Sequence, residues 1–230
     1  MNTRSSRMIA LVTAVVVIAV VAAFVILELR PGSPSNGTTP LAAAEVRSYQ
    51  GQDLSSISDV PENAIAGTQY LNESDYQLTV TGLTATTKVS TYREILDNHR
   101  HYSKVVTLDC VEGWSVRILW EGVLVRDLIN EAGADPRANT VIFHAADGYT
   151  TSFPLSYVMD NDIIIAYKMN NVTIDAEHGF PFRLVAEDKW GYKWIKWIDE
   201  IELSDNPDYQ GYWEQRGYSE SGNLSESQYS

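Results

Sequence analysis

The chain's single cysteine, Cys110, is the residue whose type most directly offers chemistry. One cysteine cannot form an intramolecular disulfide, so its thiol is left for packing, metal ligation or nucleophilic attack. The residues before it, Val105-Val106-Thr107-Leu108, are β-branched or apolar, and Glu112-Gly113 breaks that pattern. We therefore expect Cys110 to lie where a buried strand opens into a loop, a common place for a site residue.

Cys110 by itself leaves three alternatives open: a buried hydrophobe, a ligand of a soft metal, or a nucleophile. A nucleophile needs a histidine base, and none of the four histidines has a protease-like local signature: His99, His101, His144 and His178. A zinc site needs more soft ligands, and the sequence has no Cys-x-x-Cys or His-Glu-x-x-His. Spacing alone does not decide between these alternatives.

Three later segments carry aromatic and basic side chains at close spacing. They are Ala166-Tyr167-Lys168-Met169-Asn170, His178-Gly179-Phe180-Pro181-Phe182-Arg183-Leu184-Val185 and Trp190-Gly191-Tyr192-Lys193-Trp194-Ile195-Lys196-Trp197. Taken alone, Tyr167 would be an ordinary strand tyrosine, and the two lysines of the third segment would be solvated charges beside core tryptophans.

The order of these motifs after Leu-Asp-Cys-Val-Glu-Gly-Trp-Ser resembles the molybdopterin-binding catalytic domain of the sulfite oxidase family, which includes the bacterial periplasmic methionine-sulfoxide reductases. The resemblance extends from about Tyr70 to Leu203. It implies an α+β, mainly β, sulfite-oxidase-type fold with molybdopterin as cofactor, in an oxidoreductase that transfers an oxygen atom on a small sulfur or nitrogen oxide. The sequence contains no haem domain, so we expect a separate electron-transfer partner, with a membrane haem protein or a quinone-linked protein as candidates.

The resemblance implies roles for individual residues. Cys110 matches the cysteine whose thiolate binds molybdenum, and Tyr167 matches the active-site tyrosine of Ala-Tyr-x-Met-Asn. His178 and Arg183, in His-Gly-x-Pro-x-Arg, match positions that hold the pterin and its phosphate. Arginine suits the phosphate because its planar fork donates paired hydrogen bonds.

A second basic cluster is implied by Lys193 and Lys196, which match positions at the pterin phosphate and the oxyanion pocket. The resemblance thus gives Cys110, Tyr167 and Lys193 as catalytic residues, and adds Tyr70 to the cofactor-binding set. His144 and Asp147 are weaker candidates, because they lie in a strand-to-turn region that nothing local distinguishes from a turn.

Two departures from the family pattern bear on the substrate. Thr68-Gln69-Tyr70 stands where sulfite oxidases carry an anion-binding arginine, and Val-Glu-Gly-Trp after the cysteine is similar to the reductase branch. A second hypothesis is a cofactor-free binding or interaction module on the same fold, since Arg4-Ser5-Ser6-Arg7 is not a twin-arginine signal.

The elements that must position these residues can be predicted from periodicity and capping. Thr91-Tyr92-Arg93-Glu94 is a capping box that opens a helix through Leu96, and Leu124 to Ala132 has helical spacing and ends at Gly133. The expected strands are Tyr76 to Gly82, Val105 to Leu108, Val116 to Trp120, Thr140 to Phe143, Thr150 to Phe153, Ile163 to Tyr167, Phe182 to Val185 and Ile195 to Leu203.

Composition divides the chain into five parts. We expect a cytoplasmic N-terminus (1–8), a transmembrane anchor (9–27), a flexible linker (28–66), the molybdopterin-binding domain (67–206) and a polar tail (207–230). Arg4 and Arg7 precede the apolar run, so the positive-inside rule predicts a single-pass cell-membrane protein whose C-terminal domain is extracytoplasmic. The net charge of -13 argues against nucleic-acid binding.

Overall fold

The computed structural model describes residues 44–230, which form a mainly β structure with a few short helices. Its strands are β1 (Ser48–Tyr49), β2 (Gln52–Asp53), β3 (Gln77–Gly82), β4 (Lys88–Thr91), β5 (His101–Asp109), β6 (Ser115–Leu124), β7 (Thr140–Ala145), β8 (Thr150–Pro154), β9 (Ile164–Met169), β10 (Val172–Thr173), β11 (Arg183–Val185) and β12 (Ile198–Ser204). Its helices are α2 (Tyr92–Asn98), α3 (Val125–Ala132) and α4 (Leu155–Asp160), with 3-10 turns η1 (Ile57–Asp59), η2 (Gly191–Lys193) and η3 (Glu214–Arg216).

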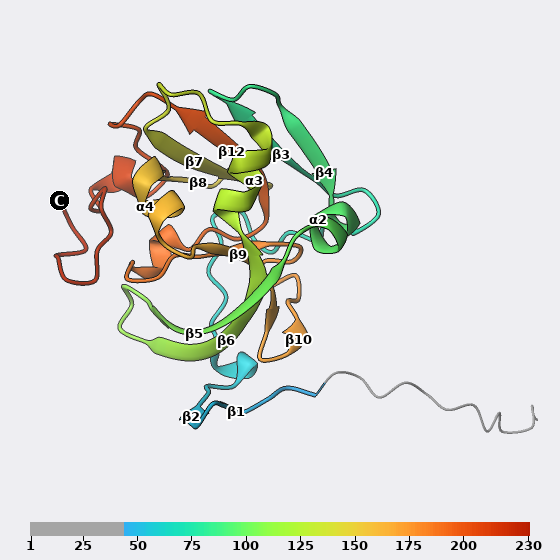
Figure 1. The fold of residues 1–230 in the computed structure, drawn as a ribbon. Coiled ribbons are helices and arrows are strands. Elements are labelled where there is room, and N and C mark those ends of the chain that lie inside the picture. The colour runs from blue at the N-terminus through green and yellow to red at the C-terminus, as the bar shows by residue number, and fades with distance from the viewer. Residues whose placement is uncertain (1–43) are drawn as a thin grey trace, which may run out of the picture. The chain divides into compact units, whose positions relative to one another are not determined.

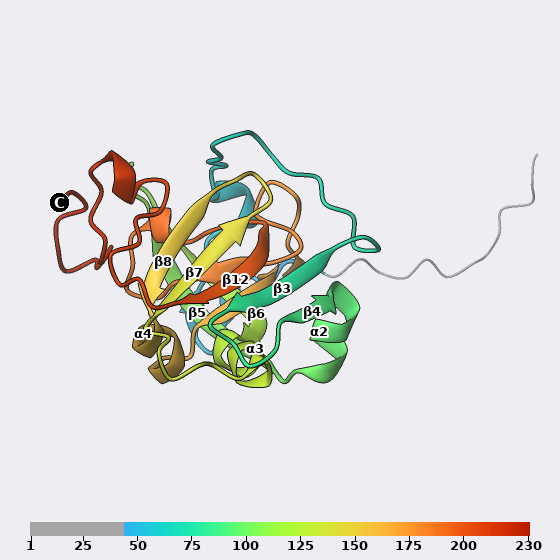
Figure 2. The same ribbon diagram turned by 90° about the horizontal axis from the view of Figure 1, so that it is seen from above.

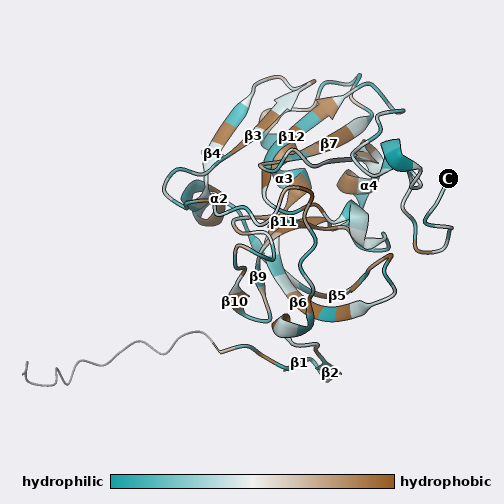
Figure 3. Ribbon diagram, turned by 180° about the vertical axis from the view of Figure 1, so that it is seen from behind, coloured by the Kyte–Doolittle hydropathy of each residue, from teal (hydrophilic) through white to brown (hydrophobic). Residues whose placement is uncertain are grey.

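The strands form two sheets that enclose the apolar core. One sheet has the order β10-β9-β6-β5, with β11 also paired to β9, and the other has the order β4-β3-β12-β7-β8. Figure 1 shows the β12 sheet and the long β5–β6 ribbon as separate layers, and Figure 2 shows α2, α3 and α4 along one side of them. Hydrophobic residues gather on central strands such as β11, whereas η3 is hydrophilic (Figure 3). Trp120, Phe143 and Phe182 are fully buried in this core.

The local signals for the helices are confirmed. Thr91 Oγ1 accepts a hydrogen bond from the Glu94 amide at 3.2 Å, and the Glu94 carboxylate accepts from the Thr91 amide at 2.9 Å. This reciprocal pair satisfies free amides of the first turn of α2. At the end of α3, Gly133 adopts a left-handed backbone with φ of 70°, which suits glycine because it has no Cβ.

The last strand differs from its predicted bounds. It begins at Ile198 rather than Ile195, because Trp197 takes a left-handed conformation with φ of 52° and a bulge follows between Ile198 and Glu200. The alternation of a strand with one buried face fails at this point, because the consecutive residues Trp197 and Ile198 are both buried. A bulge shifts the face to which later side chains point, which a strict period of two cannot anticipate.

Part of the predicted flexible linker contacts the domain. Residues 44–66 include β1, β2 and η1, and they bury Leu54 and Val60. The Val46 amide donates to the Asn170 carbonyl at 2.9 Å. The remaining linker, the predicted anchor and the N-terminus lie outside residues 44–230. Within the described part, no helix combines the length and apolar character needed to cross a membrane.

Asn170, at the end of the Ala-Tyr-Lys-Met-Asn segment, fastens this N-terminal segment to the sheet. Its Oδ1 accepts from the Leu119 amide at 3.0 Å, while Nδ2 donates to the Ser55 carbonyl at 2.9 Å and to Glu45 at 3.0 Å. The residue is fully buried with φ of 47°, a left-handed conformation that asparagine tolerates well.

Asn170→Ala is expected to lower the free energy of unfolding by about 2–4 kcal/mol, because the Leu119 amide is left buried without a partner. Urea denaturation measures the change. The matched control is Asn171→Ala, since Asn171 is exposed and also left-handed, with φ of 69°. Equal losses in the two variants would assign the effect to backbone conformation rather than to hydrogen bonding.

The polar tail, residues 207–230, returns across the domain, and we call it the C-terminal strap. The Tyr212 amide donates to the Thr150 carbonyl at 2.9 Å, and the Leu224 amide donates to the Asp188 carbonyl at 3.0 Å. Glu214, a charged residue within it, is only 4% exposed. The strap is therefore part of the packed structure and brings its own side chains to the site described next.

Candidate functional site

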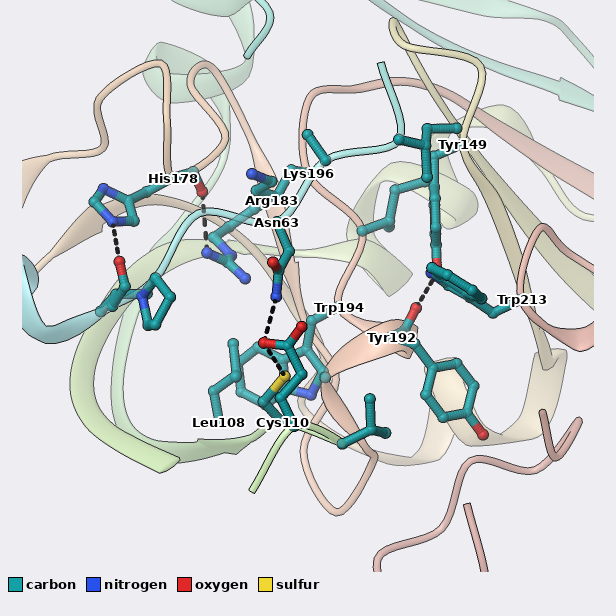
Figure 4. Close-up of a pocket in the computed structure, with 18 of the residues that line it drawn as sticks. Asn63, Leu108, Cys110, Tyr149, His178, Arg183, Tyr192, Trp194, Lys196 and Trp213 are labelled. Atoms are coloured by element: carbon teal, nitrogen blue, oxygen red, sulfur yellow. Dashed lines mark hydrogen bonds between the residues drawn. The ribbon is translucent and has the colours of Figure 1, made fainter. Parts of the chain in front are cut away.

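A cavity of about 290 Å³ collects side chains from five separate parts of the chain, one of which is the turn between β7 and β8 with Asp147 and Tyr149. Residues 60–65 form one wall, and the turn from Leu108 to Trp114 forms another. Further walls come from within residues 177–197 and from Trp213 and Tyr218 of the C-terminal strap. In Figure 4, Trp213 and Tyr192 lie on the opposite side of Cys110 from His178.

Cys110 follows the end of β5, as the sequence predicts, and its side chain lines the cavity. A tight turn holds it: the Cys110 amide donates to the Trp114 carbonyl at 2.9 Å, and the Gly113 amide donates to the Cys110 carbonyl at 3.0 Å. Gly191 lies beside it, where a Cβ would be 3.4 Å from the Cys110 Cα. Burial raises the pKa of the Cys110 thiol. A bound soft metal would displace the thiol proton, because the thiolate is the ligand.

A carboxylate stands next to this thiol. Glu112 Oε2 lies 4.0 Å from Cys110 Sγ, and it accepts hydrogen bonds from Trp114 Nε1 at 3.1 Å and Asn63 Nδ2 at 3.2 Å. The bonds from Trp114 and Asn63 lower the pKa of Glu112. The space beside the sulfur therefore carries a fixed negative charge.

Two cations line another part of the cavity, Arg183 buried and Lys196 partly buried. Arg183 is 4% exposed; one guanidinium nitrogen donates to the His178 carbonyl at 3.0 Å, whereas Nε has no hydrogen-bond partner. Burial lowers the pKa of Arg183 to about 10. Lys196 donates to the Glu177 carbonyl at 2.7 Å, and burial, followed by the charge of Arg183, lowers its pKa to about 8.

Neither cation forms an ion pair with a carboxylate of residues 44–230. Buried charges are normally paired, and Arg183 is buried without a carboxylate, so this half of the cavity is built to receive an anion. Gly179 permits the arrangement: with φ of 113°, it sits where a Cβ would come within 3.0 Å of the Lys196 Cβ and 3.1 Å of the Arg183 Cβ.

His178 lines the same cavity, but both of its ring nitrogens have protein partners. Nδ1 lies 2.7 Å from an Asp175 carboxylate oxygen, and Nε2 lies 3.1 Å from the Val60 carbonyl. The ring thus connects the His-Gly-Phe-Pro-Phe-Arg segment to residues 60–65, while its backbone carbonyl orients Arg183. The histidine supports the cation rather than offering a free nitrogen to a ligand.

Three predicted site residues lie outside the cavity lining. Tyr167 donates its hydroxyl proton to Glu121 and lies 2.6 Å from His101 Nδ1, because its position on β9 directs the side chain toward that pair. Lys193 is fully buried in an ion pair with Glu214. Tyr70 is 82% exposed. A motif fixes the order of residues along the chain but not the direction in which each side chain points.

Of the two weaker candidates, Asp147 lies at the cavity and His144 does not. Asp147 lines the cavity and also caps a turn by accepting from the Tyr149 amide at 3.0 Å. His144 does not line it; its Nε2 lies 2.9 Å from Glu202, and with Glu200 these two form a surface group on β7 and β12.

The cysteine-hydrolase alternative lacks its base. Within residues 44–230, Glu112 is the one side chain at hydrogen-bonding distance from the Cys110 sulfur, and it is no imidazole. Each of the four histidines has a ring nitrogen bonded elsewhere: His99 to Ile95, His101 to Leu96, His144 to Glu202 and His178 to Asp175.

Comparison with known proteins decides the family. The family model described as oxidoreductase molybdopterin binding domain matches residues 65–213, which include the cavity lining from Ile65 to Trp213 but not the lining residues before Ile65 or Tyr218. The chain belongs to this family. This molybdopterin-binding oxidoreductase takes molybdopterin as its cofactor and stands near the methionine-sulfoxide reductase branch of the sulfite oxidase family.

Several curated proteins are similar in sequence to this oxidoreductase. It is 33% identical over 161 residues to a putative protein-methionine-sulfoxide reductase subunit, YedZ1, of Azospira oryzae, covering 69% of this chain and 61% of that protein. It is 28% identical to the mitochondrial sulfite oxidase of Drosophila melanogaster, covering 83% of this chain and 37% of the relative. An uncharacterized oxidoreductase of Bacillus subtilis, YuiH, is 32% identical, covering 65% of this chain and 75% of its own length.

A solved structure supports the fold. The sulfane dehydrogenase SoxCD of Paracoccus pantotrophus matches with a TM-score of 0.62 at 21% identity, covering 84% of this chain and 61% of the other. The present chain spans well under two thirds of the sulfite oxidase and slightly under two thirds of YedZ1 and SoxCD. The sulfite-oxidase-type fold expected from the motifs is thus confirmed.

The residues of the cavity fit molybdopterin. Its metal requires a soft ligand, which Cys110 offers, and its phosphate requires donors such as the unpartnered Nε of Arg183 and the ammonium of Lys196. In Figure 4, Arg183 and Lys196 lie apart from Cys110, which suits a cofactor that carries its metal and its phosphate on different parts of the molecule.

Cofactor retention should depend on pH through Lys196. In the cofactor-free protein, Lys196 has a pKa of about 8. A bound phosphate would raise this pKa, so above pH 8 the lysine takes up a proton when the cofactor binds. We expect affinity to fall by up to about 10-fold per unit as pH rises through about 8. Release rates measured from pH 7 to 9 test this. Lys196→Arg should flatten the dependence because arginine stays charged; an unchanged slope in that variant would assign the effect to another group.

Proposed function

We propose that this chain is a membrane-anchored, extracytoplasmic molybdenum oxidoreductase that transfers an oxygen atom on a small sulfur or nitrogen oxide, in the manner of a sulfoxide reductase. The observation that carries the proposal is one cavity with a buried thiol at one side and, at another, two cations without a carboxylate partner, Arg183 buried and Lys196 partly buried. In the reductive direction, the substrate's bond to oxygen breaks, an electron pair and two protons are consumed, and water leaves.

The chain's residues have distinct tasks in this proposal. Molybdopterin supplies the redox chemistry. Cys110 ligates the metal as thiolate, while Arg183 and Lys196 hold the phosphate. Trp213 and Tyr218 cover the cavity and limit the access of water. Burial and the neighbouring Tyr229 raise the pKa of Tyr218, so its phenol stays protonated and can donate a hydrogen bond to a substrate oxygen.

The electron source and the location rest on sequence and relatives. YedZ1 is described as a subunit, and the similar protein-methionine-sulfoxide reductase MsrP of Gluconobacter oxydans as a catalytic subunit. These descriptions support a separate electron-transfer partner, with a membrane haem protein or a quinone-linked protein as candidates. The uncharged apolar run from Ile9 to Leu27, preceded by Arg4 and Arg7, supports an anchor with the N-terminus in the cytoplasm.

Charge beside the thiol favours neutral oxides over anions. Glu112 is the charged group next to Cys110, whereas the cations are engaged by the phosphate in this proposal. A sulfoxide or an amine N-oxide escapes the repulsion that sulfite would experience there.

Glu112→Gln should therefore shift specificity toward anions, raising the ratio of kcat/KM for sulfite to that for a neutral sulfoxide by about 5- to 10-fold. Steady-state kinetics in both directions measure the ratio. Glu62→Gln is the control, because Glu62 is exposed and does not line the cavity. A ratio that moves equally in both variants would show that net charge, not this position, is responsible.

The proposal as a whole is tested with the full chain produced in a host that synthesises molybdopterin. Metal and pterin analysis should find about one of each per chain, and reduced dyes should drive turnover of sulfoxides or N-oxides. Protease accessibility in spheroplasts should place the domain outside. A loaded protein that turns over no oxide would refute oxygen-atom transfer, and a folded chain without cofactor would favour the binding-module alternative.

A further inference from the structure

A buried ion pair joins the site region to the C-terminal strap. Lys193 Nζ lies 2.6 Å from Glu214 Oε1, and neither side chain is exposed to solvent. Nζ also donates to the Ser152 carbonyl at 2.8 Å and the Glu220 carbonyl at 3.0 Å, which accounts for all three of its protons. One ammonium thus connects η2, β8 and two points of the strap.

The strap lies directly on this lysine and its neighbours. A Cβ at Gly222 would come within 2.5 Å of the Lys193 Cγ, so the backbone of the strap contacts the lysine stem. The Tyr192 hydroxyl donates to the Ser219 carbonyl at 2.7 Å, and Lys189 Nζ donates to the Ser221 carbonyl at 2.9 Å. The segment from Lys189 to Lys193 therefore forms the surface on which the strap is held.

The same segment adjoins the cysteine, because Trp190 forms a β-bridge with Asp109 and a Cβ at Gly191 would lie 3.4 Å from the Cys110 Cα. In sequence, Glu214 lies between Trp213 and Tyr218, the two strap residues that line the cavity. The ring centroids of Trp213 and Tyr218 are 5.2 Å apart. Tyr218 in turn contacts Tyr192 at 5.0 Å. The ion pair between Lys193 and Glu214 therefore joins the strap to the domain next to the two aromatic residues, Trp213 and Tyr218, that line the cavity.

We propose that Lys193 and Glu214 are positioning residues: their buried ion pair holds the strap so that Trp213 and Tyr218 close the cofactor cavity. A buried pair is costly to desolvate and contributes little net stability, but it fixes the register of the groups it joins. Removing one partner leaves the other buried and uncompensated, which favours release of the strap.

The test uses the full chain carrying molybdopterin and the variants Lys193→Met, Glu214→Gln and Lys193→Met/Glu214→Met. Two quantities are measured: tryptic cleavage after Arg216, which is exposed within the strap, and the rate at which molybdenum and pterin leave during gel filtration. Arg126→Met is the matched control, since it breaks the Arg126–Asp162 pair at the surface.

Each single variant should be cleaved after Arg216 at least about 10-fold faster than the unmodified chain and lose cofactor correspondingly faster, with no change in Arg126→Met. Cleavage that accelerates while cofactor release does not would overturn the proposal, because the pair would then anchor only the tail. Unchanged cleavage would overturn it as well.

If the single variants fail to fold, the double variant still decides the matter, because it leaves no charge unpaired. It should fold and yet release cofactor faster, since the directional bonds to the strap are gone; release at the original rate would refute the proposal. Tryptic cleavage and cofactor release require bound cofactor, as the proposed function states, but no turnover. A failure of oxygen-atom transfer would therefore not affect the result of this test.

Discussion

Replacing Cys110 by serine is expected to lower oxide turnover by more than about 100-fold, beyond the 10- to 100-fold typical of residues that only support a ligand. A serine hydroxyl is nearly the same size but is a hard, weakly acidic donor that cannot supply a thiolate to a soft metal. Molybdenum per chain, the metal spectrum and the turnover rate should all change together.

The fold should survive this substitution, because the hydrogen bond from the thiol to Glu112 is long, at 4.0 Å, and serine is nearly the same size. Leu108→Val serves as the control for packing at the same cavity, since Leu108 is buried and lines it. We expect that variant to lose some stability but to keep its metal spectrum. A serine variant with the original spectrum and rate would exclude Cys110 as the metal ligand.

Arg183→Met is expected to act in opposite directions on stability and on cofactor binding. The pKa of Arg183 falls from its ordinary 12.5 to about 10 on folding, so the buried charge costs about 3 kcal/mol wherever the pH is below 10. This cost declines as pH rises from about 10 toward 12.5. Methionine removes it, and the cofactor-free domain should gain about 1–3 kcal/mol of unfolding free energy.

The same substitution should lower pterin content by at least about 10-fold, because the phosphate loses its bidentate partner. Urea denaturation of the cofactor-free protein and pterin analysis of the loaded protein provide the two measurements. Arg183→Lys keeps the charge without the fork, so it should retain the instability while binding less tightly. A methionine variant that is destabilised and still binds pterin would show that Arg183 serves the core and not the cofactor.

The features that depend on near neighbours in the chain were predictable. Cys110 lies at the end of its strand, and the capping box at Thr91 and the glycine stop at Gly133 form as expected. Arg183 and Lys196 line the cavity, although the sequence offers no sign that both would lack a carboxylate partner.

The features that depend on distant contacts were not predictable. Tyr167 and Lys193 point away from the cavity, toward Glu121 and Glu214. Because these two carboxylates lie far from them in sequence, no local pattern predicts the direction of either side chain. Composition alone places Trp213 and Tyr218 in a polar tail and Asn63 in a flexible linker, whereas all three line the cavity. A usable signal was the density of aromatic residues in that tail, since Tyr209, Tyr212, Trp213 and Tyr218 need apolar surroundings that a free tail would lack.

The participation of the C-terminal strap in the cavity wall also sets an order of events during biosynthesis. Because Trp213 and Tyr218 complete the wall, a nascent chain that has not yet been translated through Tyr218 holds Cys110 and Arg183 in an open trough rather than an enclosed chamber. Ribosome-bound intermediates should therefore retain cofactor poorly. Loading becomes an event that follows translation of the strap, and quality control can act on any molecule whose strap has not yet closed over its cofactor.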